Sequence, residues 1–176
     1  MKHIVKVSGL LLILILTSCV DKRRAIEEKV KNYEKSGILY KDNQIVFSDS
    51  FADSPLEITP DFKEKYKMFN TSSDTVLVQG ELVNVSTFTS DKDLMKIYET
   101  SSEIGLSQLE LTSNKIVLQR GIRIGMKKSD VYKAFLTLDT IRDKKDEIVI
   151  MGGEESLEFF FKGDTLFKIK FGTRVH

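Results

Sequence analysis

The side chains that most often carry out chemistry in proteins are few in this chain of 176 residues. Its two histidines are His3 and His176, and Cys19 is its one cysteine. Histidine is the commonest general base near neutral pH, and cysteine is intrinsically a strong nucleophile. Catalytic triads that use histidine, and zinc sites that use histidine or cysteine, are therefore not expected. Carboxylates, lysines, tyrosines and hydroxyls remain for any chemistry.

Four carboxylates lie close together in the sequence around Pro55: Asp49, Asp53, Glu57 and Asp61. Their spacing is not that of an EF-hand loop, whose ligands fall at fixed offsets around a glycine. A calcium site here stays open as an alternative, but we assign no metal ligand and no cofactor. Paired carboxylates that hydrolyse glycosides are defined by their separation in space, so the sequence leaves that reaction open as well. We assign no catalytic residue.

The residues before Cys19 form an ordered pattern. Lys2 and Lys6 are basic, residues 7–16 are almost all Leu, Ile and Val, and Thr17 and Ser18 precede the cysteine. About 20 apolar residues are needed to span a bilayer, so this segment is too short for a stable spanning helix. It predicts a cleavable export signal. An ordinary secretory signal and an uncleaved anchor are the alternatives.

The run Leu16-Thr17-Ser18-Cys19 resembles the bacterial lipobox, whose cysteine receives a diacylglyceryl group before cleavage. The resemblance implies that residues 1–18 are removed and that Cys19 carries the lipid, including fatty acyl chains such as palmitate. Stable attachment needs at least two acyl chains, which this group supplies. Residues 19–36 would then form a lipidated anchor with an amphipathic helix, whose narrow apolar stripe is Ile26, Val30 and Tyr33.

Charge and composition exclude one class of partner. The chain has 27 Lys and Arg against 26 Asp and Glu, and removal of residues 1–18 would lower the first number to 25 and give a net charge of −1. Nucleic-acid binding needs a strongly basic surface, so it is not expected. The 41% of hydrophobic residues is enough to build a core.

The remaining pattern predicts an α+β fold, with antiparallel sheet meanders and a few short helices packed on one side. We expect a β-rich part over residues 37–114 and a strand, a helix and three strands over residues 115–176, in one compact unit. In the first part, a helix after Thr59-Pro60-Asp61 has the apolar face Phe62, Tyr66 and Phe69. Strands are predicted at residues 38–40, 44–51, 104–111 and 115–118, and a hairpin is predicted with one strand on each side of residues 79–81. A polar turn is predicted at residues 70–74 and helical turns at residues 91–98.

The last third is the most regular part. Gly121 and Gly125 bracket a turn, after which Val131, Ala134, Phe135 and Leu138 fall at helical spacing. Three strands are predicted at 148–151, 157–162 and 166–171. The expected arrangement is one helix against an antiparallel meander.

This segment resembles the Gly-Met-x-x-x-x-Val helix and following strands of the SmpA/OmlA (BamE-like) lipoproteins and of β-lactamase-inhibitor-protein-like domains. The matching residues are Gly125, Met126, Val131 and the closing hairpin with Phe159, Phe161, Leu166 and Ile169. The resemblance covers roughly residues 115–171 and implies a binding or scaffolding role without catalytic residues. Two features depart from it. Lys127 stands where those families carry a Ser or Thr helix cap, and the β-rich first part has no counterpart.

These observations predict a membrane-anchored lipoprotein of the bacterial cell envelope, on the outer membrane facing the periplasm. It would act as a non-enzymatic protein-binding or scaffold module, held to the membrane through Cys19 and in contact with another envelope protein. The alternatives are an inhibitor or immunity lipoprotein that neutralises a toxin or hydrolase, and a small carboxylate-dependent hydrolase. An exposed apolar patch would favour the first, a strongly charged concave surface the second, and two carboxylates across a deep cleft the third.

Overall fold

The structure is a computed structural model that describes residues 37–41, 43–135, 138 and 144–173. Its contacts divide the chain into two compact units, residues 1–39 and 40–176. Almost all of the described residues belong to the second unit, which carries the sheet.

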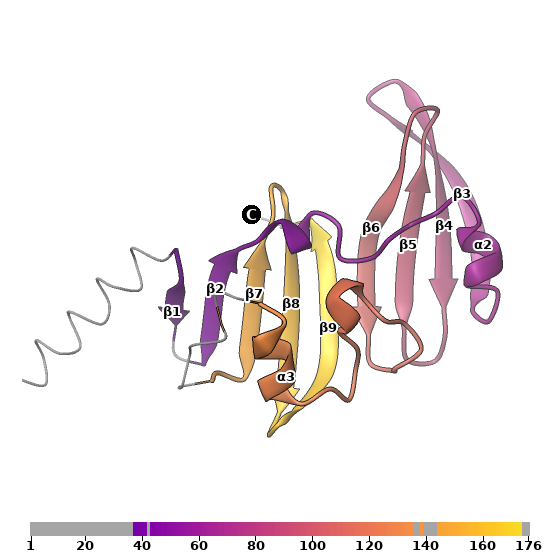
Figure 1. Cartoon of the computed structure of the whole chain (residues 1–176). Helices are drawn as coiled ribbons and strands as arrows, with labels where there is room; N and C mark the ends of the chain where they lie inside the picture. Colours follow the sequence, from indigo (N-terminus) through magenta and orange to yellow (C-terminus); the bar gives the residue numbers. More distant parts are fainter. Residues whose placement is uncertain (1–36, 42, 136–137, 139–143, 174–176) are drawn as a thin grey trace, which may run out of the picture. The chain divides into compact units, whose positions relative to one another are not determined.

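The second unit is built on a mixed sheet of nine strands, in the order β1-β2-β7-β8-β9-β6-β5-β4-β3 (Figure 1). The strands are β1 (Leu39–Lys41), β2 (Gln44–Ser48), β3 (Asn70–Val78), β4 (Glu81–Thr89), β5 (Leu94–Glu99), β6 (Ile104–Leu111), β7 (Glu147–Met151), β8 (Glu155–Lys162) and β9 (Thr165–Thr173). Two short helices, α2 (Phe62–Lys65) and α3 (Lys128–Lys133), and two 3-10 turns, η1 (Ser50–Ala52) and η2 (Gln119–Gly121), complete the described part. The fold is therefore dominated by its sheet, with few helical residues.

The expectation of purely antiparallel meanders was wrong at one pair of strands. β2 runs parallel to β7, in a register from Gln44 opposite Glu147 to Ser48 opposite Met151. A parallel pair needs a long crossover connection. Here the connection contains all of β3 to β6. The pairing was not predicted, because local sequence patterns do not show which distant strands are neighbours.

One face of the sheet carries the core. Directly opposed residues form a continuous apolar row from β2 to β4: Phe47, Ile150, Leu157, Phe171, Leu109, Met95 and Phe88. All of these side chains are buried. Because side chains alternate between the two faces of a strand, the intervening residues lie on the opposite face.

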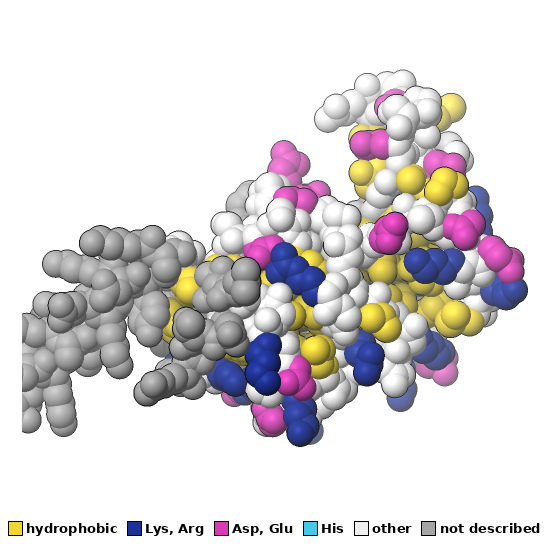
Figure 2. All heavy atoms as spheres, viewed as in Figure 1, with side chains coloured by type: hydrophobic (Ala, Val, Ile, Leu, Met, Phe, Trp, Pro, Cys, Tyr) yellow, Lys and Arg dark blue, Asp and Glu magenta, His cyan; other side chains and the backbone are white. Residues whose placement is uncertain are grey.

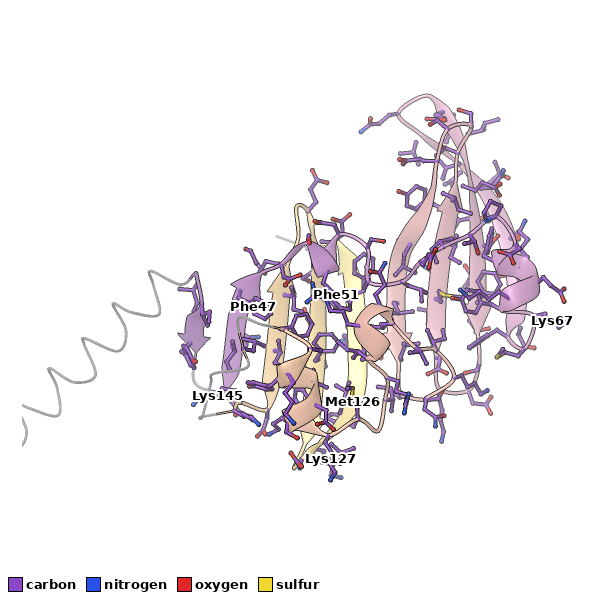
Figure 3. The ribbon with its side chains drawn as sticks, viewed as in Figure 1. Phe47, Phe51, Lys67, Met126, Lys127 and Lys145 are labelled. Atoms are coloured by element: carbon purple, nitrogen blue, oxygen red, sulfur yellow. The ribbon has the colours of Figure 1, made fainter. Side chains whose placement is uncertain are left out.

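Both short helices pack against this buried face. In α2, Phe62 lies edge-on to Phe88 at 5.7 Å between ring centroids. After α3, the Phe135 ring lies against the rings of Phe47 and Phe51, at 5.6 and 5.4 Å between ring centroids. Figure 3 labels Phe47 and Phe51. The predicted apolar faces are confirmed in part. Phe62, Tyr66, Phe69, Val131, Phe135 and Leu138 are buried and Ala134 is half-buried, but α2 ends at Lys65 and α3 at Lys133, so both faces continue beyond their helices.

The C-terminal prediction of one helix and three antiparallel strands is confirmed by α3 and by β7, β8 and β9. The prediction of helical turns at 91–98 was wrong, because β5 occupies Leu94–Glu99 with Met95 and Ile97 buried at alternate positions. The polar segment 70–74 is the start of β3 and not a turn.

One further strand prediction failed, and another extended three residues too far. No strand forms at 115–118, although Ile116 and Leu118 are buried. The strand predicted over 44–51 ends at Ser48, where Asp49 caps η1 by accepting a hydrogen bond from the Phe51 N–H at 2.8 Å.

Candidate interaction surface

The predicted lipidation site, Cys19, and the amphipathic helix predicted within residues 19–36 lie outside the described residues. Within the described part of the chain, every helix is too short to cross a bilayer.

The carboxylates around Pro55 do not form one cluster, and three of them have different partners. Asp49 forms an ion pair with Arg120 at 2.8 Å, and Asp53 accepts a hydrogen bond from the Gly153 N–H at 3.1 Å. Asp61 accepts a hydrogen bond from the Thr59 hydroxyl at 2.5 Å, which lowers the pKa of its carboxyl group. Across the described ranges, no three histidine, cysteine or acidic side chains converge on a possible metal position. Asp49, Asp53 and Asp61 thus stabilise turns and join segments.

Asp93 is the most deeply buried carboxylate of the described residues. It accepts hydrogen bonds from the Thr112 and Ser113 N–H groups at 2.9 Å each, and from the hydroxyls of Ser113 and Ser90. Desolvation opposes its ionisation, but these bonds outweigh that effect and lower the pKa of Asp93. The group joins the start of β5 to the end of β6. A pocket of about 410 Å³ is lined by its hydrogen-bonding partners Ser90 and Ser113, but Asp93 itself does not line it.

The sheet face opposite the core is polar over β6, β8 and β9. Glu158, Lys170 and Glu110 stand opposite one another across these strands. Lys168 lies 2.5 Å from Glu110, and this hydrogen bond lowers the pKa of Glu110. The charges alternate, so this region presents neither a strong one-signed field nor an apolar patch.

The β3–β4 hairpin differs from the rest of that face. β4 pairs with β5 only over Asn84–Thr89, so the hairpin extends beyond its neighbour on one side. Its tip is a two-residue turn in which Gln79 (φ 50°) and Gly80 (φ 89°) both adopt positive φ. This is the geometry of a tight hairpin turn. Four large apolar side chains near the tip are exposed: Val76, Leu77, Val78 and Leu82.

The apolar surface is continuous on only one face of this hairpin. On the face away from the helices, Val76 stands opposite Val83, and Val85 stands opposite Tyr98 of β5. On the other face, Leu77 stands opposite Leu82, and the next pair, Thr75 and Asn84, is polar and hydrogen-bonded at 2.8 Å. The leucine pair is therefore isolated, whereas the valines continue into the sheet.

A groove of about 490 Å³ lies on that face, opposite to the one against which the described helices pack. Its apolar floor is Val76, Val78, Val83, Val85 and Tyr98, and we call it the hairpin groove. The Tyr98 ring lies over Gly105 of β6, where a Cβ atom would come within 2.6 Å of the ring. Only glycine leaves this space, so Gly105 sets the position of the groove's aromatic side chain.

The rim of the hairpin groove is acidic. Glu81 accepts hydrogen bonds from the Ser101 hydroxyl at 2.8 Å and from the Ser101 N–H at 3.3 Å, and Glu103 lies on the same side. Burial raises the pKa of Tyr98, and the Glu103 and Glu155 carboxylates raise it further. None of the described residues that line the groove is Lys or Arg. Figure 2, viewed from the side of the described helices, shows apolar and acidic side chains next to one another on the part of the molecule that holds β3 to β6.

The hairpin groove was not predicted, but the sequence carries a signal for it. Val76-Leu77-Val78 and Leu82-Val83 are apolar at consecutive positions on both sides of a tight turn. Successive residues of a strand face opposite ways, so such runs must expose apolar groups unless both faces are covered. No protein-family model, no curated protein and no solved structure matches this chain, so the hairpin groove is interpreted from its own geometry.

Proposed function

We propose that this protein is a membrane-anchored lipoprotein of the cell envelope that acts as a non-enzymatic protein-binding module. The observation that carries the proposal is the hairpin groove, because a continuous apolar surface left in water is typical of an interaction site. The groove lies on a regular sheet, which holds its side chains in fixed positions.

The cellular location rests on the sequence. The basic residues, the short apolar segment and the run ending at Cys19 support removal of residues 1–18 and lipid attachment at Cys19. The protein would sit on the outer membrane facing the periplasm, held by its acyl chains. Its partners would be that membrane and another envelope protein.

The order of α3 and of β7 to β9 supports a relationship to the BamE-like and β-lactamase-inhibitor-protein-like domains. We also propose that the fold belongs to the α+β class, with short helices on one side of antiparallel meanders. Lys127 at the N-cap of α3 makes no side-chain capping bond, which is the departure noted in the sequence.

An inhibitor or immunity lipoprotein is the second candidate, and the acidic rim of the hairpin groove favours it, because such pairs often associate through opposite charges. A carboxylate-dependent hydrolase receives less support. Asp49 is held by Arg120, Glu110 by Lys168 and Asp93 by backbone N–H groups, so these carboxylates already have structural partners.

Affinity purification of the full-length protein from solubilised membranes, followed by mass spectrometry, tests the proposal. The groove variant replaces Val76 and Val83 by serine; the matched control replaces Leu77 and Leu82, the adjacent opposed pair on the other face. We expect an envelope protein to co-purify with the wild type and the control and to be lost from the groove variant. A partner that still co-purifies with the groove variant would contradict the proposal. Enzymatic turnover of a substrate, abolished by substitution of a single carboxylate, would contradict it as well.

A further inference from the structure

The hairpin groove joins an apolar floor to a rim of one charge sign, and this combination selects a kind of partner. We propose that the groove binds a segment of a partner protein in which apolar side chains are accompanied by Lys or Arg. This inference rests on the proposed protein-binding function and adds the chemistry of the partner.

The floor requires apolar side chains from the partner. Val76 and Val83 form an opposed pair, and Val85 and Tyr98 form the next pair along the sheet on the same face. Val76 is 39% exposed and Val78 is 48% exposed, so water covers part of this surface in the free protein. Covering it with apolar groups removes that contact with water, which is the main driving force of most protein association.

The rim requires positive charge. Glu81 is fixed by two hydrogen bonds to Ser101, and Glu103 lies beside Tyr98, whose hydroxyl group it contacts. Asp74 shares the same face, opposite Val85. The basic residue next along β5 on this face is Lys96, opposite Thr87 and outside the groove. Complementary charges steer a cationic segment to the groove and disfavour an acidic one.

The partner lies across the sheet face and does not add a strand at its edge. β3 is an edge strand, and an exposed edge is a common site of strand addition. The Asp74 carboxylate, however, accepts a hydrogen bond from the Thr75 N–H at 2.8 Å and so covers a donor in the middle of that strand. The acidic rim also disfavours the surface of a membrane that contains anionic lipids.

Site-specific photo-crosslinking in cells that make the full chain tests this inference. A photoreactive amino acid is introduced in place of Val83, in the groove, and in a separate protein in place of Leu82, on the opposite face of the same strand. Ultraviolet light should join position 83, and not position 82, to a protein. Mass spectrometry should place the crosslink in a segment that contains apolar residues with Lys or Arg.

Removal of the rim charges tests the electrostatic part. Glu81→Gln with Glu103→Gln keeps oxygen atoms that accept hydrogen bonds, and it should reduce the crosslink from position 83 by about two- to tenfold, as expected for two exposed charge pairs. An unchanged yield, equal capture from position 82, or capture of an acidic segment, a lipid or a second copy of this chain would overturn the inference. Capture of another protein's acidic segment would leave the proposed function standing, whereas capture of no protein would overturn both.

Discussion

At the scale of single residues, the structure separates side chains that hold the fold from those that face water. Arg120 shows the first kind: its guanidinium pairs with Asp49 and lies over the rings of Phe51 and Phe135, at 5.0 and 4.8 Å from their centroids. One charged residue thereby joins η1 to the segment after α3. These contacts give Arg120 a structural role.

Truncation of Phe135 tests the packing at this junction. Phe135 is fully buried and contacts Phe47, Phe51 and Phe159. Phe135→Ala should lower the free energy of unfolding by about 3–5 kcal/mol, the usual cost of a buried phenylalanine. Phe167→Ala is the matched control, since Phe167 is 44% exposed, and it should cost at most about 0.5 kcal/mol. Equal denaturant midpoints for the wild type and Phe135→Ala would mean that this side chain does not pack in the core.

Lys127 offers a stabilising substitution. It occupies the N-cap of α3 with extended backbone angles, and its side chain makes no capping hydrogen bond. Figure 3 labels it at the start of the helix. Lys127→Thr supplies a hydroxyl oxygen that can accept a hydrogen bond from an N–H of the first helical turn, and it should stabilise the protein by about 1 kcal/mol in chemical denaturation. Lys127→Ala removes the same charge without providing a cap, so a similar gain from it would argue against capping as the cause.

Asp93 should contribute to loss of stability in acid. Its pKa is lowered in the folded state, so its contribution is fully present above the ordinary value of 3.8 and is lost as pH falls through the lowered pKa. Asp93→Asn should cost about 1.5–3 kcal/mol at pH 7, because charge-assisted hydrogen bonds are weakened. It should also flatten the dependence of the free energy of unfolding on pH below about 4. If wild type and variant lost stability in parallel there, the acid sensitivity would arise elsewhere.

At the scale of elements, exposure explains both the successes and the failures of the sequence prediction. Helices and strands with one buried face were found, as at α2, with Phe62 and Tyr66 inward, and at β8, with Leu157 and Phe159 inward. β3 was missed at 70–74 because an edge strand exposed on both faces has no alternation of apolar and polar residues. Residues 91–98 were wrongly predicted to be helical, because the spacing of the apolar residues Leu94, Ile97 and Tyr98 fits one face of a helix, whereas the structure has a strand there.

The candidate site was predicted only in part. The hairpin around residues 79–81 was predicted correctly, although its turn is Gln79-Gly80 alone and Glu81 already belongs to β4. The hairpin groove was not predicted, because Tyr98 and Glu103 join the hairpin only through the pairing of β4 with β5, which the sequence does not reveal. Pairings between distant segments, such as β2 with β7, escape a reading of local patterns for the same reason.

Gly105 tests how β5 and β6 shape the groove. Gly105→Ala places a methyl group within 2.6 Å of the Tyr98 ring, so the ring must move. We expect a loss of about 1–3 kcal/mol in the free energy of unfolding. The pKa of Tyr98, raised in the wild type by burial and by Glu103, should move toward its ordinary value in a spectrophotometric titration. Gly172→Ala is the control, because the atom nearest to a Cβ at position 172 would be 3.9 Å away. Equal effects of the two substitutions would mean that Gly105 does not determine the position of Tyr98.

At the scale of the whole molecule, the sheet of residues 40–176 joins two halves. β3 to β6 form one meander and β7 to β9 another, and the four residue pairs between β6 and β9 connect them. α2 packs on the first half and α3 on the second. The hairpin groove lies on the face opposite to the one against which the described helices pack, so binding does not require the core to be disturbed.

The proposed function further requires that this sheet be held at a membrane surface. Lipid attachment at Cys19 would provide that position, because two acyl chains give stable anchoring without a spanning helix. A protein restricted to one surface meets its partner at a raised effective concentration, so a groove of modest affinity is sufficient.

The most direct test of this account is metabolic labelling with a fatty acid, combined with mass spectrometry of the N-terminal peptide. In the wild type, the label should be incorporated and the first residue should be an acylated Cys19. In Cys19→Ser, the label should disappear while the protein is still exported. Label that persists in Cys19→Ser, or a wild-type protein that retains residues 1–18 without lipid, would contradict the claim that this chain is a lipid-anchored envelope protein.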